Sequence, residues 1–235
     1  MKIAVVCCLH GTEPYGLEVV KRLPVFISYF IGNEISLMEN KRFIEVDLNR
    51  CFPGNKFGNH EEKLAYDLYC KLKEFEYVID LHSSSNKCPL FGIITKQNKE
   101  KIELAKKLGL NKLVVMQESI ASGKALIDFV NCGISLEVGP HNRLENVKEV
   151  SDLINNLIES KNYSNYIEVY EVFKVVKKER DSILINNFEH IQKNQIIAED
   201  LTDKQLSDED FTAVLVNEEA YKNILCLATR KINGF

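Results

Sequence analysis

Short apolar runs alternate with longer amphipathic segments along the first two-thirds of the chain, and this alternation limits the folds that the sequence can adopt. The runs that predict strands are Ile3–Leu9, Val25–Ile31, Phe43–Val46, Tyr77–Leu81, Phe91–Thr95, Lys112–Met116 and Gly133–Val138. The segments whose apolar spacing favours helices are Pro14–Arg22, Glu61–Phe75, Lys99–Leu108 and Val147–Ser160. Strands separated by helices predict an α/β fold, with a largely parallel or mixed sheet flanked by helices.

The remainder of the sequence, from about Tyr163, has a different pattern. Residues Tyr166–Lys177 alternate apolar and polar side chains, as a half-exposed strand does. The shorter runs that predict further strands are Ile183–Ile185, Ile196–Ala198, Thr212–Val216 and Leu225–Thr229. We therefore expect an α/β domain over residues 1–162 and a smaller, β-rich domain over residues 163–235, packed against each other.

Composition argues against several classes of protein. The net charge is −4, and the 30 Lys and Arg residues are dispersed among 34 acidic ones, so we expect no nucleic-acid partner. No apolar stretch approaches the ~20 residues of a membrane-spanning helix. The first apolar run is too short for a signal peptide, which favours a cytoplasmic protein without a membrane partner. The seven cysteines are odd in number and lack C-x-x-C spacing, so we expect free thiols.

Two of the predicted strands end in residues that commonly bind metals. His10 and Glu13 follow the first apolar run with the spacing H-x-x-E, and His82 follows Tyr77–Leu81. The carboxyl ends of such strands form the usual ligand-binding edge of an open α/β sheet, and Gly11 permits a sharp turn there. Two histidines and a glutamate are a known catalytic zinc set with one open position. Taken singly, each has a simpler interpretation, as a helix-entry histidine, a first-turn acid or a surface histidine.

Glu137 is the candidate for the acid–base group that a zinc hydrolase requires. It lies near the end of the apolar run Gly133–Val138 and is followed by a Gly-Pro turn. A charged residue at the end of a buried strand is unusual without a partner. A carboxylate there could take a proton from an attacking water and pass it to the leaving nitrogen. The alternative is an ordinary acidic residue in a surface turn.

The segment RFIEVDLNR supplies candidate groups for binding an anionic substrate. Arg42 and Arg50 bracket Asp47 and Asn49 in this segment. A guanidinium binds a carboxylate through two parallel hydrogen bonds, and a neighbouring amide adds orientation. One arginine could stabilise an oxyanion while the other holds a substrate carboxylate. The alternative for either arginine is a solvated surface residue.

Several segments, spread over nearly the whole chain, resemble one enzyme family. They are HGTEPYG, DLNRCFPG, DLHSSS and LEVGP, followed in the C-terminal part by IEVYEVFKVV and VNEEAY. In this order they resemble the aspartoacylase and succinylglutamate desuccinylase family of zinc-carboxypeptidase-like hydrolases, and most closely its aspartoacylase branch. The resemblance implies one zinc ion per chain, held by His10, Glu13 and His82, and a role for Asp47 in orienting the arginines.

The resemblance also implies roles for the remaining candidates. Glu137 would act first as general base and then as general acid, and Arg42 would stabilise the oxyanion at the scissile carbonyl. Asn49 and Arg50 would hold the α-carboxylate of the amino-acid half of the substrate. Tyr221 would reach the substrate from the C-terminal domain, which would cap the active site.

The chain departs from the family pattern in two places. Thr12 stands where family members commonly have Asn, a change that need not affect the metal. The aspartoacylase branch also uses an arginine, upstream of the catalytic glutamate, for the side-chain carboxylate of its substrate. Between Val115 and Glu137 the only basic residue is Lys124, which would offer a point charge rather than a fork.

The resemblance therefore implies a zinc-dependent amidohydrolase that deacylates a small N-acyl amino acid, with N-acetylaspartate-like substrates favoured. Within the enzymes, a succinylglutamate desuccinylase and a small-peptide metallocarboxypeptidase are the alternatives, because a clamp for a free α-carboxylate suits all three. A non-catalytic carboxylate-binding module is the alternative from another class. Family analogy also suggests a homodimer.

Overall fold

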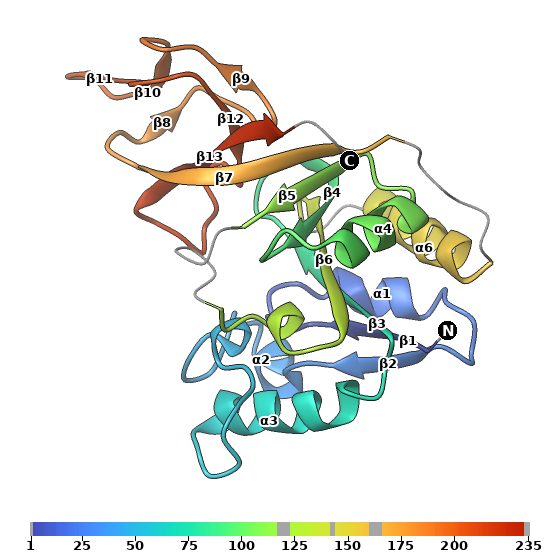
Figure 1. The fold of residues 1–235 in the computed structure, drawn as a ribbon. Coiled ribbons are helices and arrows are strands. Elements are labelled where there is room, and N and C mark those ends of the chain that lie inside the picture. Colours follow the sequence, from blue (N-terminus) through green and yellow to red (C-terminus); the bar gives the residue numbers. More distant parts are fainter. Residues whose placement is uncertain (1, 117–122, 142–143, 160–165, 233–235) are drawn as a thin grey trace.

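The computed structural model describes residues 2–116, 123–141, 144–159 and 166–232 of the chain. Within these residues, ten strands form the main sheet: β1 (Ile3–Cys7), β2 (Ser28–Ile31), β3 (Tyr77–Ser83), β4 (Cys88–Ile94), β5 (Lys112–Val115), β6 (Cys132–Gly139), β7 (Glu168–Lys177), β9 (His190–Ile191), β12 (Phe211–Val214) and β13 (Ile224–Ile232). Their order across the sheet is β2-β1-β3-β6-β4-β5-β7-β13-β12-β9 (Figure 1). The sheet contains parallel and antiparallel pairs, which confirms the predicted mixed α/β fold.

Helices cover both faces of the sheet. They are α1 (Tyr15–Val20), α2 (Glu34–Met38), α3 (His60–Leu72), α4 (Lys99–Leu108) and α6 (Leu144–Ile158), with two short 3-10 helices, η1 (Leu48–Arg50) and η2 (Leu126–Asp128). Helices α1, α4 and α6 lie together on one face, and α3 lies on the other (Figure 1). None of the helices in the described ranges has the length and apolar character that a membrane-spanning segment requires.

The apolar run of β1 is buried on both sides because helices cover both faces. Ile3, Val5 and Cys7 pack in the core shared with α1, α4 and α6. Ala4 and Val6 point the other way and pack in the core shared with α3. A strand with two buried faces reads as a continuous apolar run rather than an alternating one, which is the pattern that the sequence shows.

The parallel strands bring the candidate site residues to one edge. β1, β2, β3 and β6 run in the same direction, so their carboxyl ends meet. The register between β3 and β6 pairs His82 with Glu137 and Asp80 with Ser135. These four side chains therefore share one face of the sheet, beside the turn that carries His10 after β1.

The C-terminal region continues the sheet and returns to this edge. β7 pairs in parallel with β5 and antiparallel with β13, which pairs in turn with β12. Beyond them lies a small sheet of β8 (Ser182–Ile183), β10 (Ile196–Glu199) and β11 (Lys204–Leu206) (Figure 1). The predicted β-rich character of this region is confirmed. Between β12 and β13, the carbonyls of Val216 and Asn217 accept hydrogen bonds from the Asn86 side chain, at 3.1 and 2.6 Å.

One predicted strand is not formed, one begins later than predicted, and one short helix was not predicted. Residues 43–46 form no strand, because the backbone N–H groups of residues 44–46 donate to the buried carboxylate of Glu61 instead of to a neighbouring strand. The strand predicted over Val25–Ile31 starts only at Ser28, after an exposed turn in which the Ile27 N–H donates to the Pro24 carbonyl. Helix α2 was missed because its five residues are too few to show a helical period.

Candidate functional site

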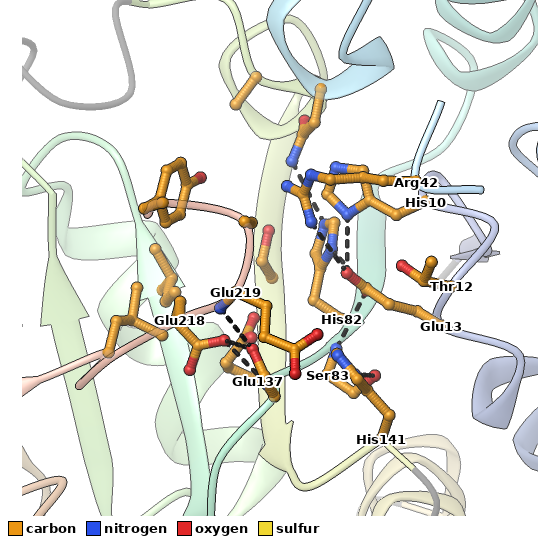
Figure 2. Close-up of a pocket in the computed structure, with 18 of the residues that line it drawn as sticks. His10, Thr12, Glu13, Arg42, His82, Ser83, Glu137, His141, Glu218 and Glu219 are labelled. Carbon is orange, nitrogen blue, oxygen red and sulfur yellow. Dashed lines mark hydrogen bonds and ion pairs between the residues drawn. The ribbon is translucent and has the colours of Figure 1, made fainter. Parts of the chain in front are cut away.

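All eight predicted site residues line one cavity of about 310 Å³ at the carboxyl edge of the parallel strands. They are His10, Glu13, Arg42, Asn49, Arg50, His82, Glu137 and Tyr221. Figure 2 shows His10, Glu13 and His82 close together, with Arg42 above them and Glu137 further along the cavity. The structure therefore assembles one site from five separate segments of the sequence.

The turn after β1 directs His10 and Glu13 to the same point. The Glu13 N–H donates to the His10 carbonyl at 3.1 Å, and the Gly11 N–H donates to the Arg42 carbonyl at 3.2 Å. A Cβ at Gly11 would lie 2.2 Å from the backbone of Ser36, so only glycine permits this approach. The glycine predicted to allow a sharp turn is therefore required by close packing against a neighbouring segment.

His10, Glu13 and His82 form a buried cluster that could hold a metal ion. One ligand atom from each lies within 4.8 Å of the others. Nδ1 of His10 lies 2.8 Å from Oε1 of Glu13, and Nδ1 of His82 lies 3.1 Å from Oε2. The Glu13 carboxylate is fixed further by the Ser83 N–H at 3.1 Å. Two imidazole nitrogens and one carboxylate suit zinc, and they leave a coordination position open.

The other nitrogen of each histidine meets a second carboxylate, which supports this assignment. Nε2 of His10 lies 3.1 Å from Asp47, and Nε2 of His82 lies 2.7 Å from the fully buried Asp80. Each carboxylate accepts the Nε2–H and leaves the unprotonated Nδ1 facing Glu13, which is the tautomer that a metal ligand needs. Ser135 Oγ also donates to Asp80, at 3.1 Å. The donor set therefore fits a zinc ion.

Arg42 is held above the cluster by Asp47. Nε and Nη2 of Arg42 donate to Oδ2 of Asp47 at 3.3 and 3.1 Å, and Nη1 lies 3.5 Å from Glu13. Although burial alone would raise it, His10 and Arg42 hold the pKa of Asp47 well below its ordinary value. The ionised Asp47 therefore orients both a candidate ligand and the candidate oxyanion group.

Arg50 is oriented differently from Arg42. Its Nη1 donates to the Asn49 carbonyl and its Nη2 to the Tyr221 hydroxyl, both at 2.8 Å. Oδ1 of Asn49 accepts the Leu126 N–H at 2.9 Å, which fixes the amide so that Nδ2 lies 3.3 Å from His82. The three predicted clamp residues are thus in contact, and Tyr221 reaches them from the segment after β12.

Glu137 lies beside His82, its partner in the register of β3 and β6. Burial raises the pKa of its carboxyl well above the ordinary value, and the neighbouring carboxylates of Glu13 and Glu218 add to the shift, against His82 and Arg42. A carboxyl with a raised pKa is suited to accept a proton and to return it.

Several polar residues of the cavity were not predicted from the sequence. Ser83, Ser85, His141, Glu218 and Glu219 all line it. Ser83 Oγ lies 2.8 Å from Nδ1 of His141, and Ser85 contacts both glutamates. No sequence spacing joins these residues, because they come from the end of β3 and the residues just after it, from the turn after β6 and from the segment after β12.

Asp80 was also missed, although a signal for it exists. Asp80 and His82 are two residues apart on one strand, and this spacing places their side chains on the same face. An acid at that position can reach the histidine, as the 2.7 Å contact shows.

Between Val115 and Glu137, most of the described residues that line the cavity are apolar. Met116, Ala125 and Ile127 line the cavity from this segment, and Ser135 is its polar contribution. Lys124 is exposed and is not among the lining residues. Residues 117–122 lie outside the described part of the chain.

Comparison with known proteins identifies the family. A family model described as the succinylglutamate desuccinylase/aspartoacylase catalytic domain matches residues 1–158. The chain belongs to this family. A probable aspartoacylase of Acaryochloris marina is 29% identical over an alignment 162 residues long, and the match covers 59% of this chain and 55% of that protein. The match therefore spans about half the length of this curated relative of the desuccinylase/aspartoacylase family.

Solved structures show the same fold over almost the whole chain. Murine aminoacylase 3 superposes with a TM-score of 0.82 at 18% identity, covering 99% of this chain and 95% of that one. A succinylglutamate desuccinylase/aspartoacylase from Rhodobacter sphaeroides gives a TM-score of 0.74 at 15% identity, covering 98% and 86%. The likeness to these structures includes the C-terminal region, which the family model does not match.

Proposed function

We propose that this member of the desuccinylase/aspartoacylase family is a zinc-dependent amidohydrolase that deacylates a small N-acyl amino acid. The observation that carries the proposal is the grouping of His10, Glu13 and His82 with Glu137 in one cavity. A buried metal-ligand set beside an acid–base carboxylate is an arrangement for hydrolysing an amide.

The residues around the cluster account for the other requirements of the reaction. Zinc bound at the cluster would supply a Lewis acid for the acyl carbonyl and for water. Glu137 takes a proton from the attacking water and gives it to the departing nitrogen. Arg42, fixed by Asp47, stabilises the developing oxyanion. Asn49 and Arg50 bind the free α-carboxylate, with Arg50 steadied by the Tyr221 hydroxyl.

The alternatives within this proposal differ in the acyl group and in the amino-acid side chain of the substrate. An N-acetylaspartate-like substrate and a succinylated one each bring a second carboxylate. Among the described lining residues, the guanidinium groups are those of Arg42 and Arg50, and both already have roles. The homodimer and the cytoplasmic location stay predictions by analogy and composition.

Metal analysis combined with one variant tests the proposal. Purified protein should hold one zinc per chain and hydrolyse at least one N-acyl amino acid from a panel of acetyl, formyl, succinyl and aminoacyl derivatives. Glu137→Gln should keep the zinc and lose at least about a hundredfold in kcat, the range for a general acid–base group. Glu149→Gln, an exposed change on α6, is the matched control.

The opposite results have a clear meaning. Protein without metal that still binds N-acyl amino acids would be a carboxylate-binding module, and the enzyme proposal would fail. A Glu137→Gln variant with wild-type kcat would remove Glu137 from the chemistry.

A further inference from the structure

The side of the cavity away from Arg42 is lined by two consecutive glutamates. Glu218 and Glu219 follow β12, and Ser85 holds both of them: its N–H and Oγ donate to Oε2 of Glu218 at 2.8 and 2.7 Å, and its Oγ accepts the Glu219 N–H at 2.9 Å. Figure 2 shows the pair beside Glu137 and Ser83, across the cavity from Arg42. The segment is thus built to present these carboxylates.

Glu218 has an unused acceptor in this position. Its side chain lines the cavity although the residue is only 8% exposed. Oε2 is saturated by Ser85, but Oε1 is buried and has no hydrogen-bond partner among the described residues. A buried carboxylate oxygen without a donor is strongly unfavourable, so its presence points to a ligand that supplies one.

The described cationic groups of the cavity are engaged elsewhere. Arg42 is paired with Asp47, and Arg50 donates to Tyr221 and to a backbone carbonyl. His141 lies on the same side as the glutamates, but its Nδ1 is paired with the Ser83 hydroxyl. The carboxylate of Glu219 has no ion pair among the described residues and stands exposed at the rim. This side of the cavity therefore favours a cation from outside the chain.

The position of Glu218 and Glu219 relative to the reacting groups determines which half of the substrate contacts the two glutamates. Arg50, of the proposed α-carboxylate clamp, and Arg42 both lie at the Tyr221 side chain: Arg50 donates to its hydroxyl at 2.8 Å, and the Arg42 guanidinium carbon lies 6.0 Å from its ring centroid. Glu137 lines the same cavity, and Figure 2 shows it beside Glu218 and Glu219 and away from Arg42. A substrate with its α-carboxylate on Arg50 and its amide at Glu137 directs its acyl group toward Glu218 and Glu219.

We propose that Glu218 and Glu219 form a subsite for an alkylammonium group on the acyl half of the substrate. The inference rests on the proposed function and specifies its substrate class as short aminoacyl amino acids, such as small dipeptides. An ammonium offers three donors, enough for Oε1 of Glu218 and the carboxylate of Glu219. In the reaction, the water oxygen bonds to the acyl carbon, the C–N bond breaks, and the departing nitrogen takes a proton.

The proposal reverses the charge expected for the acyl group of a desuccinylase. A succinyl or malonyl group would bring a carboxylate toward two others without a described cation to pair with it. We therefore expect the order of kcat/KM to be glycyl-L-alanine, then acetyl-L-alanine, then malonyl-L-alanine. The amino-acid half is the same in all three substrates, so the comparison isolates the charge on the acyl half.

A kinetic series with zinc-loaded protein tests the subsite. Glycyl-L-alanine should exceed acetyl-L-alanine by about tenfold or more in kcat/KM, the effect of a charge-assisted hydrogen bond. Nα-acetyl-L-ornithine, with its ammonium on the amino-acid side chain, should show no such gain. Equal rates for the glycyl and acetyl substrates, a gain confined to acetylornithine, or a preference for the malonyl group would each overturn the proposal.

Neutral variants test whether the two glutamates cause the selectivity. The glycyl-to-acetyl ratio of kcat/KM should fall at least about fivefold in Glu219→Gln, whose backbone contact with Ser85 is unaffected, and also in Glu218→Gln. Glu149→Gln, remote on α6, should keep the wild-type ratio. Because a ratio within one protein is compared, partial loss of folding cancels. An unchanged ratio in both cavity variants contradicts the assignment, as does a second zinc equivalent that Glu218→Gln removes.

Binding measurements separate the failure of this subsite from the failure of the proposed function. Calorimetry on zinc-loaded Glu137→Gln protein should give a Kd for glycyl-L-alanine at least about tenfold lower than for acetyl-L-alanine. If no substrate is hydrolysed but this preference holds, the hydrolase proposal fails and the subsite stands. If acetyl-L-alanine is hydrolysed through Glu137 but the two ligands bind alike, the subsite fails and the hydrolase stands.

Discussion

Glu61 holds the segment that carries Arg42 and Asp47, and replacing it by glutamine tests this role. Its carboxylate is fully buried and accepts four hydrogen bonds. The N–H groups of residues 44–46 donate at 2.7, 3.1 and 3.3 Å, and Nδ2 of Asn33 donates at 3.0 Å. Each oxygen accepts two hydrogen bonds, and three of the four come from this one segment.

The expected loss follows from these contacts. Glutamine keeps one oxygen and places an NH₂ group where the second oxygen accepted two hydrogen bonds. Two donors lose their partner, and each unsatisfied donor costs about 1–3 kcal/mol. The retained bonds also lose their charge assistance. We expect Glu61→Gln to lower the free energy of unfolding by about 3–5 kcal/mol, the usual range for breaking a buried charged pair.

Glu62→Gln is a matched control in the same helical turn. Glu62 belongs to the capping box of α3 with Asn59, a position that glutamine also fills. Both variants remove one charge from the same turn, but only Glu61→Gln affects residues 44–46. Urea unfolding followed by circular dichroism should show a loss of less than about 1 kcal/mol for Glu62→Gln. Similar losses in the two variants would refute the role given to Glu61.

The pH dependence provides a second check on Glu61. Burial would raise its pKa, but hydrogen bonds from residues 44–46 and Asn33 outweigh burial and hold the pKa below the ordinary value of 4.5. The stabilisation is therefore complete above pH 4.5 and is lost as the pH falls through the lowered pKa. The difference in the free energy of unfolding between wild type and Glu61→Gln should therefore become smaller at acid pH. A difference that stays constant down to pH 3 would contradict the reasoning.

Three further substitutions probe the metal cluster, the clamp and the sheet. Asp80→Asn should weaken zinc binding about 10- to 100-fold, measured by competition with a chelator, because the fully buried carboxylate no longer fixes the tautomer of His82. Tyr221→Phe should raise KM about tenfold with a smaller change in kcat, because Arg50 loses the hydroxyl at 2.8 Å. Glu168→Gln should lower stability by about 1–2 kcal/mol at pH 7. Hydrogen bonds from two lysines lower the pKa of Glu168 from 4.5 to about 2, so this loss should vanish as the pH falls from 4.5 to 2.

The sequence was sufficient to predict the layers and the grouping of the strand-end residues in one place, because both depend on local patterns. β1 and β3 are buried on both faces; β1 reads as an unbroken apolar run, and β3 as an apolar run interrupted by Asp80 before His82. The parallel order of the strands then brings His10 and His82 together without further information. Glu137 was found for the same reason, since β6 pairs directly with β3.

The errors and omissions come from contacts between distant segments. The apolar residues in Phe43–Val46 suggest a strand. The N–H groups of residues 44–46 instead donate to the carboxylate of Glu61, which lies in a helix further along the chain. Tyr221 was assigned only through the family resemblance, because nothing in its local sequence indicates a contact with Arg50, 171 residues earlier. Glu218 was not assigned a role for the same reason.

Buried and half-buried carboxylates have three different sets of partners in and around this site, and these partners explain why acidic residues lie so deep in the protein. Glu13 offers ligand atoms, whereas Asp47 and Asp80 orient the histidines. Glu61 and Glu218 each accept the backbone N–H of a segment that contributes to the cavity. Glu61, which anchors a segment without lining the cavity itself, should therefore behave in mutagenesis like a residue that touches substrate. Kinetic measurements alone would not distinguish an anchoring residue from one that touches substrate. Measurements of stability would, because replacing an anchoring residue lowers the free energy of unfolding as well as kcat/KM.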